Sequence, residues 1–263
     1  MKAPAISPCR WLSRLLLLGL IVTGSGCATP PTDPAALADF KATNDPLEPM
    51  NRKIFTFNQY LDRYLIKPVA IGYKTVLPDF SRNMIRNFLN NLKEPVVFAN
   101  DLLQGEFKIA HDTFARFLMN STFGLGGLFD MAQYADLPRQ TGDFGQTLYA
   151  WGAPEGPYLV LPVFGPSSPR DAIGMGVDSV MDPFGYLAGA YDAAWDAGLG
   201  RAAATGVDER ARNIETLDDI QRNSIDFYAQ LRSLYRQHRA SDLRHGRPAP
   251  LPDFDTEDES GGK

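Results

Sequence analysis

DFGQTLYAWGAPEGPYLVLPVFGPSSPRD, residues 143–171, is the stretch of this 263-residue chain that decides the fold. Four prolines lie between positions 154 and 166, and a regular helix cannot run through them. Large apolar side chains stand between the glycines and prolines, and each would contribute about 1.5–3 kcal/mol if it were buried. They are Tyr149, Trp151, Tyr158 and Phe164. The stretch therefore predicts a rigid, non-repetitive connector that packs against an apolar surface.

The start of the chain has the pattern of a bacterial lipoprotein signal peptide. Basic residues come before a short apolar run at Leu15–Val22, and small residues then lead to Cys27. A signal peptidase needs small side chains before its cut, and lipidation needs the thiol that follows. We therefore predict a signal peptide over residues 1–26 and acylation of Cys27. The alternative is an ordinary secretory signal in which Cys27 is incidental.

Composition divides the rest of the chain into three parts. Residues 27–43 are rich in proline, alanine and threonine and predict a tether, whereas residues 246–263 predict a disordered acidic tail. Residues 44–245 are expected to form one folded domain. Removal of residues 1–26 takes away three basic residues and changes the net charge from −5 to about −8. This acidic balance argues against nucleic acid as a partner and against simple electrostatic adhesion to anionic lipid.

Apolar residues recur at helical spacing through most of residues 44–245. The first helix should be capped by Asp45, show its stripe from Asn51 to Leu65, and end at Pro68. The one β-like run, Tyr158–Val163, is interrupted by Pro162. The pattern therefore predicts a mostly α fold, whose further helices run over 81–92, 95–103, 106–120, from the Ser168 cap to about Pro183, and from Asp208 to about His238.

The helical stripes are wide and rich in aromatic residues, and they permit two interpretations. The stripes could meet in the core of a soluble bundle, or they could face lipid while the helices lie in one leaflet of a membrane. Periodicity alone does not separate these two arrangements, because both use the same stripe.

The sequence offers little for catalysis, and we predict no enzyme, no metal site and no cofactor. The three histidines, at positions 111, 238 and 245, have no cysteine or carboxylate pair nearby that would complete a metal site. The serines in GPSSP do not form a nucleophile elbow. The glycine cluster at 124–127 lacks the Lys-Ser/Thr of a nucleotide-binding loop.

Three blocks of sequence resemble the MlaA/VacJ family of outer-membrane lipoproteins. They are DFGQTLYAWGAPEGPYLVLPVFGPSSPRD at 143–171, DPLEPMNRKIFTFN at 45–58 and RFLMNSTFGLGGLFD at 116–130. The resemblance implies a single ring-like bundle of amphipathic helices embedded in one leaflet, with Gly/Pro-rich connecting loops and an amphipathic channel. It places the protein at the outer membrane, lipid-anchored on the periplasmic side, in the inner leaflet.

The resemblance also implies a function. Such a protein removes phospholipids misplaced in the outer leaflet and passes them to a soluble periplasmic carrier (MlaC-like), so that lipid asymmetry is maintained. It also implies association with a trimeric porin of the outer membrane. Two alternatives stay open: a lipidated, porin-associated scaffold without its own transport path, and a lipid-cleaving enzyme.

Seven residues besides Cys27 are candidates for a functional site. Gly124, Gly126 and Gly127 stand among large apolar residues, and they would form either a loop that lines or gates the channel or a tight turn. The polar candidates stand in apolar surroundings and need partners. They would either bond helix ends or give the channel a polar side for a phospholipid head group, and they are Asn51, Arg52, Arg116 and Asn120.

Overall fold

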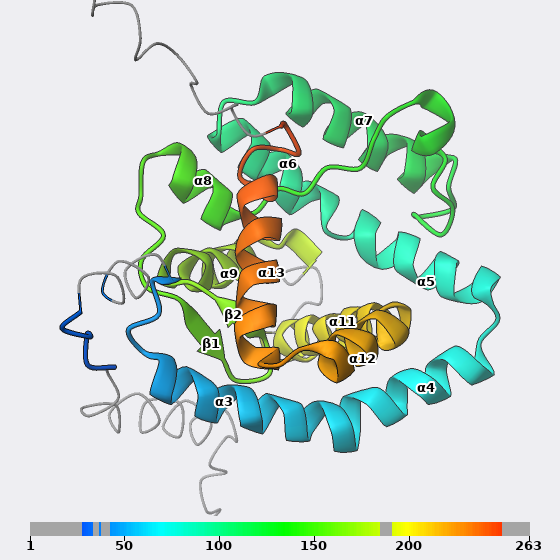
Figure 1. Ribbon diagram of the computed structural model, residues 1–263. Coiled ribbons are helices and arrows are strands. Elements are labelled where there is room, and N and C mark those ends of the chain that lie inside the picture. The colour runs from blue at the N-terminus through cyan, green and yellow to red at the C-terminus, as the bar shows by residue number, and fades with distance from the viewer. Residues whose placement is uncertain (1–27, 34–36, 38–42, 185–190, 249–263) are drawn as a thin grey trace, which may run out of the picture.

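The computed structural model describes residues 28–33, 37, 43–184 and 191–248 of the chain. The predicted signal peptide, Cys27 and residues 249–263 of the predicted tail lie outside the described residues. Helices account for most of the described chain, which confirms the mostly α prediction (Figure 1). The closed ring that the family resemblance implies stays a prediction.

The first helix is longer than its sequence predicts, because Pro68 does not end it. Helix α3 (Glu48–Leu61) passes through a π-helical turn, η1 (Asp62–Ile66), directly into α4 (Lys67–Val76). In the turn, the Lys67 N–H donates to the Asp62 carbonyl, one residue further back than in an α-helix. Pro68 follows at once and has no N–H that this shift could leave unpaired.

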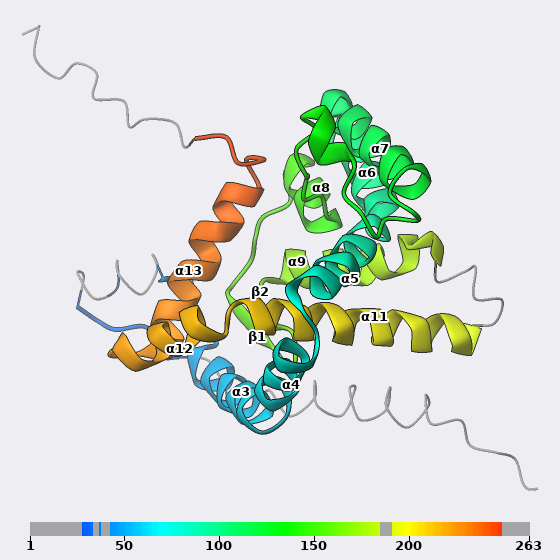
Figure 2. The ribbon, with the colours of Figure 1, turned by 90° about the vertical axis from the view of Figure 1, so that its right-hand side faces the viewer.

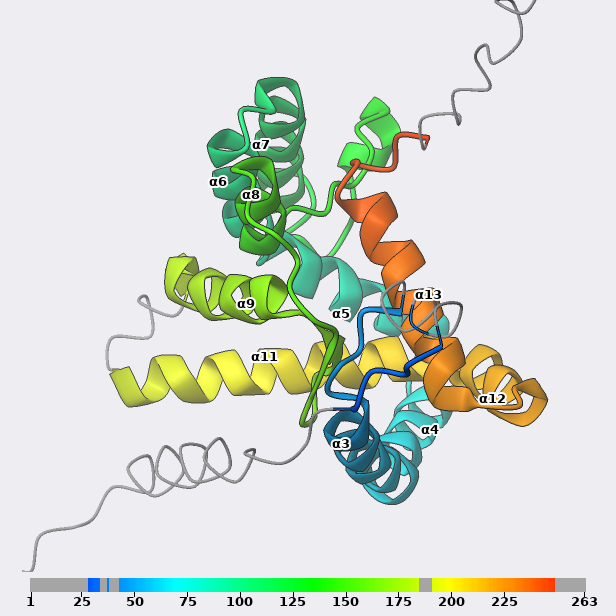
Figure 3. The same ribbon diagram turned by 60° about the vertical axis from the view of Figure 1, so that its left-hand side comes forward.

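Three further helices follow close to their predicted positions. They are α5 (Asp79–Asn91), α6 (Glu94–Leu103) and α7 (Phe107–Thr122). Helices α6 and α7 lie side by side, and the short 3₁₀ turn η2 (Ala132–Ala135) follows the loop after α7 (Figures 1 and 3). Helices α3, α4 and α5 follow the outside of the molecule in an arc (Figure 1).

The connector over residues 143–171 contains more regular structure than predicted. It begins with the short helix α8 (Phe144–Ala150) and continues into an antiparallel hairpin of β1 (Leu159–Leu161) and β2 (Gly165–Ser167). The β-like run Tyr158–Val163, which Pro162 counted against, therefore does contain a strand. Pro162 lies in the turn between the strands, where no ladder hydrogen bond is required of it. Ser168 caps α9 (Pro169–Met181) as predicted, since its hydroxyl accepts from the Asp171 N–H.

The aromatic side chains of this connector do not share one environment. Tyr158 is buried beside Phe55, Val160 and Tyr228 in a small apolar core. Three others are at least 47% exposed, so the protein itself does not cover them, and their packing against an apolar surface stays a prediction: Tyr149, Trp151 and Phe164.

The C-terminal part forms three helices where the sequence predicts one over 208–238. Asp208 belongs to the end of α11 (Tyr191–Arg212), which is followed by α12 (Ile214–Asn223) and α13 (Phe227–Asp242). The break before α13 occurs because Ser224 and Asp226 adopt extended backbone, and the Asp226 carboxylate then caps α13 at the Ala229 N–H. Figure 2 shows that α13 rises steeply from the line of α11 and α12.

Polar residues are buried and apolar residues are exposed to an unusual degree. Among the described residues, ten apolar residues are buried, compared with eighteen polar or charged ones. Twenty-six large apolar side chains are exposed, among them Tyr64, Phe107 and Phe123. This pattern is the reverse of a water-soluble core and indicates an apolar surrounding. None of the described helices is long and apolar enough to cross a membrane.

One buried arginine joins α13 to the start of α8 and of α9. Arg239 donates to both carboxylate oxygens of Asp143, at 2.6 and 2.8 Å, and of Asp171, at 2.7 and 3.0 Å. Asp143 caps α8, and Asp171 lies in the first turn of α9. Burial alone would raise the pKa of Asp171, but the bonds from Arg239 and Tyr235 hold that pKa below its usual value.

Replacement of Arg239 by methionine should destabilise the fold strongly. The variant would leave two partly or fully buried carboxylates without their cation, which costs about 3–5 kcal/mol. Chemical unfolding of the detergent-solubilised protein measures this loss. Arg222→Met is the control, because Arg222 pairs with Asp219 at an exposed position. Equal unfolding free energies for the two variants would contradict the role given to Arg239.

Candidate functional site

A polar cavity of about 170 Å³ lies among α5, α6, α7 and the loop after α7. Two of the residues that the sequence nominates, Arg116 and Asn120, are part of its wall. The other lining residues are also polar or charged, and they are Arg86, Asn87, Asn90, Asn91, Glu94, Asp130 and Arg139. Three arginines and two carboxylates line this wall, and one of the arginines, Arg86, pairs with the buried Asp208 behind it.

Arg116 and Asn120 are held by a shared carboxylate. Arg116 is 3% exposed, and its Nη2 donates to both oxygens of Asp130 at 2.9 and 3.0 Å. Asn120 donates to the same carboxylate at 3.1 Å and accepts from the Ala132 N–H at 3.0 Å. Arg116 also donates to the Leu137 carbonyl. These bonds fix the loop between α7 and η2 against the helix, so both residues have a clear structural task.

Glu94, from α6, adds a buried carboxyl group beside Arg116. Its Oε1 lies 3.5 Å from Arg116 Nε, and the side chain is 3% exposed. Burial raises the pKa of Glu94 to about 7, against the lowering influence of Arg116. Several buried polar atoms around the cavity have no hydrogen-bond partner among the described residues, namely Asn91 Oδ1, Glu94 Oε2 and Arg116 Nε. The wall therefore retains hydrogen-bonding capacity for a polar ligand.

The glycine loop packs against this cavity. Gly127 has φ +95°, and a Cβ there would lie 2.4 Å from the Asn91 Cβ, so a larger residue would displace the cavity wall. A Cβ on Gly124 would lie 2.5 Å from the Asn120 carbonyl oxygen. Gly126 has φ +73° and open space around it. The structure thus brings Gly124 and Gly127 beside Asn120, and the Gly126 carbonyl accepts from Asn91 at 3.4 Å, while the role of the three glycines in lining or gating a channel stays a prediction.

Asn51 and Arg52 lie elsewhere, in a second cluster around the hairpin. Asn51 is fully buried and accepts from the Val160 N–H at 3.0 Å while donating to the Tyr158 carbonyl at 3.0 Å. It thereby attaches β1 to α3. Arg52 lies nearer the surface and pairs with Glu48 and Asp226.

The predicted helix cap at Asp45 is wrong. Helix α3 begins at Glu48, and its N-cap, Leu47, makes no side-chain cap bond. The Asp45 carboxylate is instead buried and accepts from Asn51, Tyr228 and Arg232. A carboxylate that accepts hydrogen bonds from an arginine and a tyrosine of α13 joins distant segments of the chain, and this stabilises the fold more than a helix cap would.

Sequence reasoning missed several members of the cavity wall. Asn91 and Glu94 come from α5 and α6, and nothing in their local sequence connects them with Arg116. Asp130 closes the quoted block RFLMNSTFGLGGLFD, and its position at the end of an apolar segment could have nominated it as a partner. Among the described residues, no group of three histidine, cysteine or acidic side chains is placed to hold a metal ion.

Glu94→Gln should remove one component of the pH dependence of stability. The folded-state pKa of Glu94, about 7, lies above the unfolded value of 4.5, so the folded state binds the proton more tightly. This group therefore makes the protein less stable as pH rises from about 4.5 to about 7. Unfolding free energies at pH 5 and pH 7.5 should differ less in the variant than in the parent, by on the order of 1–3 kcal/mol. The exposed Glu215→Gln control should keep the parent difference, and an unchanged slope in Glu94→Gln would exclude the assigned pKa.

Known proteins resemble this chain over most of its length. The family model described as MlaA lipoprotein matches residues 43–242. The "Intermembrane phospholipid transport system lipoprotein MlaA" of Escherichia coli is 34% identical over 81% of this chain and 81% of that protein. The protein of the same name from Haemophilus influenzae is 35% identical over 78% and 81%. An uncharacterized protein of Rickettsia felis is 37% identical over 75% and 77%.

A solved structure agrees with these relatives. It is reported as the "Structural basis for maintenance of bacterial outer membrane lipid asymmetry" and is 35% identical to this chain. Its TM-score is 0.67, and the match covers 76% of this chain and 98% of the solved one. The range matched by the family model, residues 43–242, contains the connector, the glycine loop and the residues of the polar cavity. The chain therefore belongs to the MlaA lipoprotein family.

Proposed function

We propose that the protein takes phospholipids misplaced in the outer leaflet of the outer membrane and moves them inward along a path that includes the polar cavity. A soluble periplasmic carrier then receives them, and the asymmetry of the membrane is maintained. The names of the Escherichia coli and Haemophilus influenzae relatives and the subject of the solved structure support lipid transport as the task.

The observation that carries the proposal is the combination of a polar interior with an apolar exterior. A charged head group cannot enter hydrocarbon without partners at a tolerable cost in free energy. The cavity beside Arg116 offers guanidinium and amide donors that can replace water around a phosphate. Acyl chains could meanwhile stay in contact with the exposed apolar side chains. Such a path needs binding and geometry rather than a catalytic group.

The exterior supports residence at a membrane. Exposed apolar residues follow the outer arc of α3 and α4, and others lie on α7 and its loop. Acyl chains on Cys27 would anchor the protein on the periplasmic side, with the helices in the inner leaflet. One acyl chain gives only marginal binding, so several chains together with apolar helix faces make a stable attachment. A trimeric porin that covers part of the apolar exterior would hold the protein in place.

Residence in the leaflet can be tested with a tryptophan placed at Phe123. This side chain is 74% exposed, and the proposal puts it among acyl chains. In liposomes with brominated acyl chains, Phe123→Trp should add fluorescence that is strongly quenched relative to the parent. Gln221→Trp, at an exposed position of α12, should add fluorescence that is quenched much less. Equal quenching at both positions would contradict the proposed embedding.

Transport is tested by counting phospholipids exposed on the surface of intact cells. Cells without the gene should expose more phospholipid to a membrane-impermeant amine-reactive label, and the parent gene should restore the normal level. Asn90→Asp adds a negative charge to the cavity wall without breaking an ion pair, and it should restore the level poorly because it repels phosphate. Asn223→Asp makes the same charge change at an exposed end of α12 and should restore the level fully.

Each outcome of that experiment is informative. If loss of the gene leaves surface phospholipid unchanged, the transport proposal fails. If the gene is needed but Asn90→Asp works as well as the parent, the cavity is not on the path. A porin-associated scaffold would then explain the loss of asymmetry better than transport by this chain.

A further inference from the structure

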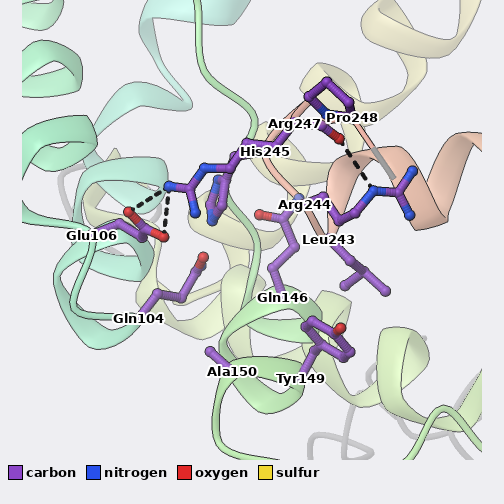
Figure 4. A pocket seen from close by; sticks show the side chains of 10 residues that line it. All are labelled: Gln104, Glu106, Gln146, Tyr149, Ala150, Leu243, Arg244, His245, Arg247 and Pro248. Carbon is purple, nitrogen blue, oxygen red and sulfur yellow. Dashed lines mark hydrogen bonds and ion pairs between the residues drawn. The ribbon is translucent and has the colours of Figure 1, made fainter. Parts of the chain in front are cut away.

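A second, larger cavity lies apart from the polar cavity, at the C-terminal end of α13. It has a volume of about 350 Å³ and is bounded by α8, the turn between α6 and α7, and the turn that follows α13 (Figure 4). One side is formed by Tyr149, Ala150 and Leu243, which offer largely apolar surface. The other side is polar, and nothing in the proposed transport path uses it.

Gln146 gives this cavity a buried group without a partner. The residue is 2% exposed, and neither its Nε2 nor its Oε1 has a hydrogen-bond partner among the described residues. Figure 4 shows its side chain between Gln104 and Leu243, with the amide end directed toward His245. The position is fixed, because the Gln146 backbone N–H donates to the Asp143 cap of α8 at 2.8 Å. A buried donor and acceptor left unpaired cost about 1–3 kcal/mol each, so a ligand that pairs with both has a clear source of affinity.

The groups around Gln146 carry little free charge. Arg247 at the rim is paired with both oxygens of Glu106, at 2.9 and 3.0 Å. Burial lowers the pKa of His245, so its imidazole is neutral at pH 7. Arg244 reaches away from Gln146 in Figure 4, and its Nε donates to the Arg247 carbonyl at 3.2 Å. A phosphate or a carboxylate would therefore find no dedicated cation beside the Gln146 amide.

A hydroxyl group suits this environment, because it donates and accepts at the same time. One hydroxyl of a ligand can pair with the Gln146 amide, and a second can donate to Gln104. The Gln104 Nε2 already donates to Thr147, so its side-chain carbonyl oxygen is the group that would accept from the ligand. The apolar C–H groups that connect the two hydroxyls of the ligand would then pack against Tyr149 and Leu243.

We propose that the cavity around Gln146 is a binding site for a polyol, such as the glycerol head group of phosphatidylglycerol. A lipid source for the polyol rests on the proposed function, because only a lipid carrier would meet such a head group regularly. A free polyol of the periplasm has the same chemistry and is the other source. The site would add a head-group preference to the transport path without a new charged contact.

The test uses the full lipoprotein in detergent, incubated with equal amounts of phosphatidylglycerol and phosphatidylethanolamine. Native mass spectrometry then counts the lipids that stay bound. We expect a preference of roughly tenfold for phosphatidylglycerol, as two good hydrogen bonds would give. Gln146→Leu keeps the volume but removes both amide atoms, and it should reduce the preference to less than twofold. Gln133→Leu, at an exposed position, should keep the full preference.

Stability separates binding from folding. Gln146→Leu removes two unpaired buried polar atoms, so its melting temperature should stay the same or rise. A preference that persists in Gln146→Leu, or a parent protein that retains both lipids equally, would overturn the polyol site and leave the transport proposal intact. A parent protein that retains neither lipid would count against the transport proposal and against a lipid source for the polyol.

A second arm identifies the source of the polyol. Saturation-transfer NMR with glycerol alone should show contact with the parent protein and none with Gln146→Leu. If glycerol binds while neither phospholipid does, the site serves a free polyol. If glycerol contacts both proteins equally, the site does not recognise hydroxyl groups through Gln146, and the inference is wrong.

Discussion

The buried guanidinium of Arg239, held between Asp143 and Asp171, is the interaction on which the rest of the fold depends. A guanidinium away from water is tolerated only when its charge and its donors are matched, and these two carboxylates match both. Because each carboxylate stands at the start of a helix, the pairing fixes where α8 and α9 begin. The hairpin lies between these two helices along the chain, and the buried Asn51 attaches it to α3.

Polar anchors of this kind have a consequence for the outside of the molecule. Since buried amides, carboxylates and guanidinium groups hold the helices together, few apolar side chains are needed between them. The apolar side chains are then available for the exterior, where an aqueous protein would place its charges. A surrounding of hydrocarbon makes this arrangement favourable, because the hydrophobic effect does not drive helices together within lipid. The polar side chains that line both cavities follow from the same principle, since they belong to this polar interior.

Local patterns predicted local structure well and tertiary partners poorly. The Ser168 cap, the stripes of α5 and α7 and the end of α9 follow from spacing and from single residues, so they were predictable. The prediction at Pro68 was wrong because a π-helical turn precedes the proline and lets the helix continue. The prediction at Asp45 was wrong because two of its three partners come from α13, far along the chain. Arg116 and Asn120 could be recognised as candidates because they are polar residues within one apolar segment. Glu94 could not, because its contact with Arg116 depends on how α6 packs against α7.

The sequence by itself determined the helical class, the family and the polar residues that have to find partners, because these depend on periodicity and on motifs within short segments. Only the tertiary structure decided which polar residues meet. It separated Asn51 and Arg52 from the cavity of Arg116 and Asn120, and it left the Gln146 side chain at the edge of another cavity with no partner among the described residues. The reason is physical: a hydrogen bond between distant segments depends on how the helices pack, and the periodicity of one helix does not specify which helix packs against it.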